Sequence, residues 1–588
     1  ITTRLVGSEM CIRDRCNLLL QKAPLIASEQ DRNSALGEAY FLRGYNYYRL
    51  FCQYERCPLQ LEPIDVSAGV PRNFKLSSGE DVLNQVIDDL QKAYDLLRTD
   101  DWRGAGTWTK YTAAHFLAKA LLYRQSERCT WKSNYPAKTD LDRAIRLCDE
   151  VIDARGLEKD YNNLYSNWTG VDCNIEKSKE ILMSALHNDA STTVGRYGNR
   201  TYNYFSSQYN TYSGGYVPRG QYIGDMEFQR CRPTEYTYAV FDNVNDSRMW
   251  KTFKTVYGIC NHVATPDYVK AENAPTFGDQ GVLFLLNKKD DTRFRKDEFG
   301  RAAVKHTFVN PETGKWVPNV APIYAEGQYV MNTYGTSAAN RSNMFCGINK
   351  TADGSRTGEK GDAHRDVTMA RVGETYLVKA ECQVRNGDDA GALATINLLR
   401  KRAEWKADED REYYVDGTIA FKSNSTASGN CAKGNKDANG AKLTNQQAFE
   451  YSFIQKNSYV LSTGVERPAE GESWNASNLQ ISSWNNLPAE DQAVLNGMGL
   501  SVNTLEGKVN FILNERTREL LGEWNRWDEL SRTKTLYKRA KLFNPETLYI
   551  QEHHNLRPIP QSFLDGLTND NGEPLTDQEK KDMQNPGY

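Results

Sequence analysis

The segment from Phe511 to Arg532, FILNERTRELLGEWNRWDELSR, constrains the fold more than any other part of this 588-residue chain. Several of its residues recur at spacings of three, four and seven positions, which is the period of a helix face packed against a core. They are Leu513, Leu520, Leu521, Trp524, Trp527 and Ser531. Three glutamates recur every four residues, with arginines on neighbouring rows: Glu515, Glu519 and Glu523, with Arg516, Arg518, Arg526 and Arg532. The segment therefore predicts an amphipathic helix whose polar side is a network of ion pairs.

The same segment resembles the C-terminal signature of the SusD/RagB family, the surface nutrient-binding lipoproteins of Bacteroidetes. The signature is matched at Ile512, Glu515, Arg516, Glu519, Leu520, Glu523, Arg526, Trp527, Leu530 and Arg532, with Asp528 in its acidic position. Trp524 departs from it, because the family often has glycine or another small residue there. Downstream, Leu556-Arg557-Pro558-Ile559-Pro560 and the closing Gln584-Asn585-Pro586-Gly587-Tyr588 are similar to two further family elements.

Helical periodicity recurs over residues 35–56, 81–97, 109–124 and 141–154, which is the spacing of two helix–turn–helix units, and Ser77 and Ser78 are the two possible N-caps of the second helix. A further pair is predicted within 366–405, where Asn386-Gly387-Asp388 suits a helix end followed by a new N-cap. This pair also resembles a family motif. The expected fold is mainly α: an α/α superhelix of tetratricopeptide-like helix pairs with long irregular loops and a small β-hairpin component, as in SusD-like proteins.

We expect one compact unit with four parts: an N-terminal segment (1–34), a helical-repeat region (35–180), an irregular ligand-facing region (181–365) and a C-terminal SusD/RagB region (366–588) with a loop insert (406–506). Within the third part, residues 302–309 and 315–320 predict a hairpin. The family's signal peptide and lipid-modified cysteine are not seen, and the first sixteen or so residues resemble translated adapter sequence. We therefore expect the sequence to be truncated, with neither Cys11 nor Cys16 as the anchor.

Composition excludes several classes of function. Charged residues make up 25% of the chain and the net charge is −3, so the chain lacks the net positive charge that would attract a nucleic acid. No apolar run has the roughly 18 residues that a membrane helix needs. The twelve cysteines form no C-x-x-C pair and the seven histidines show no H-x-x-x-H spacing, so we expect no metal site. No nucleotide-binding or hydrolase motif occurs, and we expect no cofactor.

Aromatic side chains gather in two places that suit sugar binding, because Tyr and Trp join an apolar face to a polar group. Residues 197–222 hold seven tyrosines among amides, serines and glycines, and Trp102 and Trp108 flank a short loop before the third predicted helix. The resemblance implies stacking from that inter-helix region. The candidate ligand-binding residues are Trp102, Trp108, Tyr202, Tyr204, Tyr209, Tyr212, Tyr216 and Arg219. The alternatives are a Tyr-rich loop packed on its own helices or on a protein partner, and tryptophans that staple the loop to the next helix.

Paired carboxylates one helical turn apart, such as Glu519 and Glu523, could meet the spacing that glycosidases use. The surrounding arginines would lower their pKa values and oppose a general-acid role, so the sequence favours a structural ion network and no enzyme activity.

The resemblance implies a lipid-anchored protein on the outside of the outer membrane that binds a nutrient, here an oligo- or polysaccharide. It also implies delivery of that glycan, unaltered, to a SusC-like TonB-dependent transporter. Two alternatives from other classes stay open: a helical-repeat interaction scaffold with no glycan site of its own, and an α/α glycoside hydrolase. Whether the ligand is a glycan or a peptide lies beyond the sequence.

Overall fold

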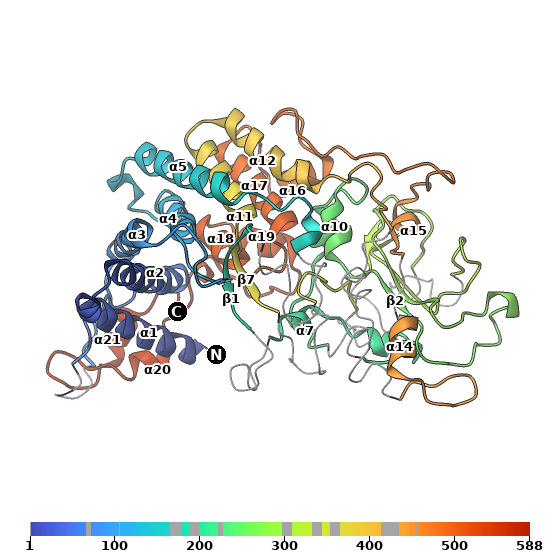
Figure 1. The fold of residues 1–588 in the computed structure, drawn as a ribbon, viewed down its shortest axis with the longest axis horizontal. Helices are drawn as coiled ribbons and strands as arrows, with labels where there is room; N and C mark the ends of the chain where they lie inside the picture. The colour runs from blue at the N-terminus through green and yellow to red at the C-terminus, as the bar shows by residue number, and fades with distance from the viewer. Residues whose placement is uncertain are drawn as a thin grey trace.

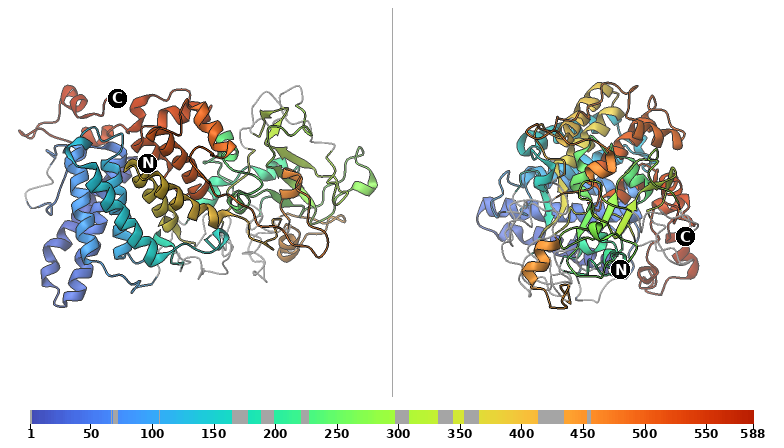
Figure 2. Two further views of the ribbon diagram at one scale, coloured as in Figure 1. Left: turned by 90° about the horizontal axis from the view of Figure 1, so that it is seen from above. Right: turned by 90° about the vertical axis from the view of Figure 1, so that its right-hand side faces the viewer.

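The computed structural model describes residues 2–65, 67, 72–104, 106–164, 178–187, 199–220, 227–296, 308–331, 344–352, 365–412, 434–452 and 456–588. It is an elongated molecule with helix pairs at one end, a central layer of helices, and an irregular end that carries the short strands (Figures 1 and 2). Both termini lie on the helical side (Figure 1).

The helical end consists of α1 (Thr2–Lys22), α2 (Glu29–Tyr54), α3 (Gly79–Leu96), α4 (Lys110–Arg124) and α5 (Ala137–Arg155). The last four cover the four predicted helices. Ser78, one of two predicted N-caps, accepts a hydrogen bond from the backbone N–H of Asp81 at 3.1 Å. Helices α2 and α3 approach closely at Gly44, where an added Cβ would lie 3.0 Å from the Cβ of Asp89. Arg43 and Asp89 form a buried ion pair at this contact, 2.7 Å apart.

The central layer contains α11 (Val372–Arg385), α12 (Asp389–Ala403), α17 (Leu505–Leu520), α18 (Arg526–Arg532) and α19 (Leu536–Phe543). Helices α11 and α12 meet where the sequence predicts. There Gly387 has a φ of 82°, a conformation that favours glycine, and Asp388 caps α12 by accepting from the N–H of Gly391. The antiparallel pair β1 (Ile181–Ala185) and β7 (Val367–Arg371) leads into α11.

The irregular end has a small sheet in the order β2-β3-β4, formed by Val256–Gly258, Gln280–Leu285 and Asn319–Pro322. Strand β2 runs antiparallel to β3, and β4 runs parallel to it. A hairpin follows, from β5 (Tyr324–Ala325) to β6 (Gln328–Tyr329). The irregular end also contains the short helices α7 (Thr201–Phe205), α8 (Tyr209–Tyr212), α9 (Glu235–Ala239) and α10 (Ser247–Thr252).

Further helices complete the chain: α14 (Asn445–Ser452), α15 (Tyr459–Thr463) and α16 (Ala489–Gly497) within the predicted insert, and α20 (Gln561–Leu564) and α21 (Asp577–Met583) near the C-terminus. Short 3₁₀ turns occur at Ala23–Leu25, Lys132–Asn134, Tyr161–Leu164, Ala271–Asn273 and Glu552–Asn555. The C-terminal segment returns to the helical end, where Asn585 donates to the backbone carbonyl of Tyr54 at 3.1 Å.

Two large apolar clusters account for most of the core among the described residues. One joins α2–α5 to α11, α12 and α17 and is built mostly from Leu, Val, Ile and Ala. The other fills the irregular end and is dominated by rings, including Tyr209, Trp250, Phe284, Trp405 and Tyr459. More than half of the residues of this second cluster are aromatic, whereas a smaller cluster at the same end, with Val256, Leu283 and Val320, is mostly aliphatic.

One sequence prediction is wrong in detail. The segment 511–532 is not one helix: α17 ends at Leu520 and α18 begins at Arg526, with positive φ at Gly522 (84°) and Trp524 (63°) between them. The predicted hairpin is present in its described part. Val309 and Trp316 form an antiparallel bridge, and the N–H of Val317 donates to the carbonyl of Phe308 at 3.0 Å. The second arm continues into β4, which pairs with β3, and residues 301–307 lie outside the described residues.

Candidate ligand-binding site

Glu515 and Glu519 of α17 are buried in an ion network that reaches across the molecule. The Glu519 carboxylate receives Arg371 at 2.6 Å, Arg248 at 3.2 Å and Arg402, which come from the end of β7, from α10 and from α12. Glu515 pairs with Arg248 at 2.8 Å. The arginines that meet Glu519 are thus supplied by other elements, whereas the sequence predicts ladder partners on the same helix. The network joins the irregular end to the helix pairs.

The rest of the predicted motif is also held by tertiary contacts. Arg516 pairs with Glu374 of α11 at 3.2 Å. Arg526 donates to the backbone carbonyl of Leu513 at 2.7 Å. Trp527 is half-buried and has the guanidinium of Arg557 over its ring at 5.2 Å.

The network is unsuited to acid catalysis. Burial by itself would raise the pKa of Glu519, but the guanidinium groups of Arg402, Arg371 and Arg248 outweigh burial and lower that pKa to about 2. Burial lowers the pKa of Lys350 to about 8, although Glu523, 3.0 Å away, opposes the shift. A carboxylate that stays ionised cannot deliver a proton to a leaving group near neutral pH. The ion network around Glu519 is therefore suited to stabilising the fold.

Most of the predicted tyrosines lie in the aromatic cluster. Four of them are buried: Tyr202, Tyr209, Tyr212 and Tyr216. Tyr209 stacks on Tyr257 with 4.7 Å between ring centroids. The expectation of a wet, exposed recognition loop is therefore wrong for these four rings, because the irregular end needs them as its core.

The other predicted residues are more accessible. Tyr204 is half-buried, and Arg219 pairs with the buried Glu227. Trp102 is 38% exposed and carries the guanidinium of Arg103 4.1 Å from its ring centroid. Trp108 instead packs on Phe41 of α2, with 5.0 Å between ring centroids. Trp102 alone of the tryptophan pair presents substantial surface.

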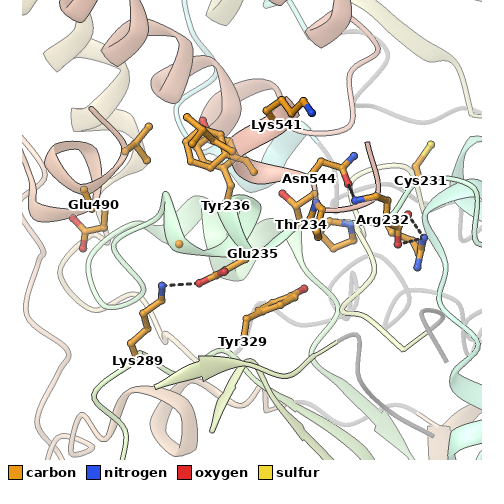
Figure 3. A pocket seen from close by; sticks show the side chains of 18 of the residues that line it. Cys231, Arg232, Thr234, Glu235, Tyr236, Lys289, Tyr329, Glu490, Lys541 and Asn544 are labelled. Atoms are coloured by element: carbon orange, nitrogen blue, oxygen red, sulfur yellow. Dashed lines mark hydrogen bonds and ion pairs between the residues drawn. The ribbon is translucent and has the colours of Figure 1, made fainter. Parts of the chain in front are cut away.

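A cleft of about 710 Å³ opens between the irregular end and the central helices, within the volume range of small-molecule sites. Its walls come from α9, α16, β6, and the end of α19 with the loop after it (Figure 3). The ring of Tyr236 stacks on Phe543 with 4.7 Å between centroids. The Tyr236 hydroxyl is turned into the protein, where it donates to Asn514 at 3.0 Å and accepts from Arg539 at 3.2 Å. The Tyr236 ring is thus fixed in position as part of one wall of the cleft.

Charged groups of both signs surround this wall. Lys289 pairs with Glu235 at 2.7 Å across the lower part of the cleft (Figure 3). Arg232 binds both carboxylate oxygens of Glu546 at 2.6 Å. Burial raises the pKa of Glu490, and the charge of Asp242 raises it further. These polar groups can donate hydrogen bonds to the hydroxyl groups of a ligand and accept hydrogen bonds from them.

One hydroxyl of the cleft lacks an internal partner. Tyr329, on β6, points its ring along the floor of the cleft (Figure 3). Its oxygen is buried and has no hydrogen-bond partner among the described residues. A buried polar atom of this kind costs free energy until something binds it, which makes it a candidate contact for a ligand hydroxyl.

Sequence reasoning missed this cleft for a physical reason. Its lining comes from segments around residues 230–239, 289, 329, 490–494 and 541–546, which are far apart along the chain and share no periodic pattern. The only local signal is the Asn544-Pro545 turn after α19.

The sequence matches two family profiles. Residues 150–432 match the profile described as the SusD family, and residues 15–122 match one described as starch-binding associating with outer membrane. The chain belongs to the SusD/RagB family. No curated protein matches it.

Solved structures show the same SusD fold along nearly the whole chain. NanU of B. fragilis is 16% identical with a TM-score of 0.52, and the match covers 99% of this chain and 84% of that one. Surface glycan-binding protein A from Bacteroides fluxus is 14% identical with a TM-score of 0.51, covering 99% and 85%. At these identities the likeness establishes the fold, and the predicted mainly α class is confirmed.

Two features of the described residues bear on membrane and metal chemistry. No helix there is both long and apolar enough to cross a bilayer. No group of three or more His, Cys, Asp or Glu side chains in the same residues is arranged to hold a metal ion.

Proposed function

We propose that this SusD-family protein binds an oligo- or polysaccharide at the cell surface and delivers it, without catalysis, to a SusC-like TonB-dependent transporter. A lipid anchor outside the outer membrane belongs to the same proposal. The observation that carries it is the match of residues 15–122 to a starch-binding, outer-membrane-associating family together with the SusD fold of the whole chain.

The cleft supports a carbohydrate ligand. Its volume of about 710 Å³ has room for a few sugar units. The stacked Tyr236 and Phe543 offer apolar ring faces, and Tyr329 offers an unsatisfied hydroxyl. We assign the cleft as the main glycan site. Trp102 remains a proposed further contact, since its ring is exposed and held by arginine.

Calorimetric titration with purified protein and a panel of soluble glycans tests the binding function. The panel contains malto-, laminari-, cello-, xylo- and manno-oligosaccharides. We expect saturable binding to at least one class and no release of reducing sugar from it over several hours. Reducing-sugar release would reassign the protein as a hydrolase. The absence of binding to every class, together with co-purification of a transporter, would favour the scaffold alternative.

Tyr329→Phe tests the location of the site. Removing only the hydroxyl should weaken binding of the glycan found in the panel about fivefold, which is about 1 kcal/mol for one hydrogen bond, without lowering the melting temperature of the free protein. The matched control is Tyr324→Phe, a change on the neighbouring strand β5 at a residue outside the cleft lining. Equal affinities of Tyr329→Phe and the wild type would place the glycan elsewhere.

A further inference from the structure

Trp524 stands in a conformation that bulky side chains rarely adopt. Its φ is 63°, the neighbouring Gly522 has a φ of 84°, and the Trp524 side chain is 46% exposed. Left-handed backbone at a residue other than Gly, Asn or Asp is strained, and such strain tends to occur where function requires it. Burial does not repay this cost, because about half of the ring faces solvent.

The buried ion network fixes the turn that carries Trp524. Glu523, the preceding residue, accepts from Arg371 at 2.9 Å and from Lys350 at 3.0 Å. Both partners belong to the network around α17, so the turn cannot relax without breaking buried ion pairs. The ring is thereby held against Tyr204 and Phe205, with centroids 6.3 Å and 5.5 Å away.

A small hollow of about 30 Å³ lies beside Trp524, large enough for one hydroxyl or water. Asn199, Thr201, Thr351 and Thr368 contribute to its wall. The Thr351 hydroxyl is buried and has no hydrogen-bond partner among the residues that the structure describes. A ring face next to an unsatisfied hydroxyl is the combination that a pyranose needs, with C–H groups on the ring and a hydroxyl in the hollow.

The hollow and the cleft are neighbours through Tyr204. The backbone carbonyl of Tyr204 accepts from the N–H groups of Arg230 and Cys231, at 3.0 Å and 2.9 Å, and both of these residues line the cleft. Tyr204 therefore lies between the Trp524 ring and the cleft wall. A chain of sugar units that fills the cleft and extends past Cys231 would reach the Trp524 ring.

We infer that Trp524 and the adjoining hollow form a second pyranose-binding subsite that holds the distal units of long glycans, so that affinity rises with chain length. This inference rests on the proposed function and deepens it. It also gives a role to the residue at which this chain departs from the family signature.

The test compares a trisaccharide with an oligosaccharide of eight or more units, both of the class that the wild type binds, by calorimetric titration. The variant is Trp524→Gly, which removes the ring and also suits the positive φ, so the fold should be kept and the melting temperature should not fall. We expect about tenfold weaker binding of the long chain and less than twofold change for the trisaccharide. Trp524→Asn, whose side chain tolerates left-handed backbone, is the second variant and should behave likewise.

The control is Tyr549→Ala, which removes a ring that is 86% exposed elsewhere on the surface and should leave both affinities unchanged. If Trp524→Gly and Trp524→Asn keep the wild-type preference for long chains, or if the wild type has no such preference, the subsite is excluded while the proposed function stands. If the wild type binds no glycan of the panel, the proposed function fails and the subsite fails with it.

Discussion

The helical half and the irregular half of this protein are held together by different chemistry. Around α17, aliphatic side chains fill the spaces between helices and a buried network of glutamates and arginines fixes their register. At the irregular end, stacked and edge-on rings such as the Tyr209–Tyr257 pair replace those stripes. Two features that look like surface chemistry in the sequence, a charge ladder and a tyrosine-rich loop, are thus both internal.

This difference shows that residue type alone does not separate binding from packing. Tyrosines are enriched where the backbone is irregular, because a large ring covers more area per residue than an aliphatic side chain. Exposure and backbone strain together are the better guides, and among the aromatic residues of the described part of the chain they single out Trp524.

The largest expected effect comes from breaking the network between the halves. Glu519→Gln leaves three arginines facing a neutral amide and should lower the free energy of unfolding by about 4 kcal/mol. Urea unfolding measures it. The matched control is Glu506→Gln on the same helix, where the carboxylate is 61% exposed and 3.9 Å from Lys538, and where we expect little change. Equal losses in both variants would contradict a network that joins the halves.

Tyr209→Ala tests whether the tyrosine-rich segment is core. Truncating a fully buried ring should cost about 3 to 4 kcal/mol of stability, as for other large-to-small core changes. Thermal unfolding gives the effect, with the exposed Tyr268→Ala as the control. A loss of glycan affinity at unchanged stability would instead restore the binding role that the sequence predicts for Tyr209.

Acid should weaken the network in a defined window. The pKa of Glu519 lies at about 2 in the folded protein, below its ordinary value of 4.5, so the unfolded chain binds the extra proton first. The stabilisation is complete above pH 4.5 and is lost as the pH falls toward 2, by up to about 3 kcal/mol. Urea midpoints of the wild type and of Glu519→Gln should therefore converge below pH 4.5. A constant gap across that range would exclude the shift.

The smallest effect is expected at the surface of the helical half. Trp102→Ala should change stability by less than about 0.5 kcal/mol, since the ring lies on a loop and is partly exposed. If Trp102 contacts glycan, affinity should fall about fivefold, which is about 1 kcal/mol. Calorimetry decides between this outcome and the staple alternative. Trp108→Ala is the comparison, because its ring packs on Phe41 and its loss should cost stability instead.

Local rules recovered much of the helical half. The caps at Ser78 and Asp388, the glycine at 387 and the helical period located α2–α5, α11 and α12, because hydrogen bonds within a few residues decide those boundaries. The same rules failed at residues 521–525, where Glu523 is drawn out of the helix by Arg371 and Lys350, which are distant in sequence. The cleft could not be predicted either, since its walls come from unrelated segments.

By itself, the sequence determined the mainly helical fold, the family, and the presence of an ion network on α17, because these depend on periodicity and on short motifs. Only the tertiary structure decided which arginines meet Glu519, which tyrosines are core, and where a ligand can lie. The physical reason is that burial, exposure and long-range pairing depend on which segments meet in space, and no spacing along the chain encodes that meeting.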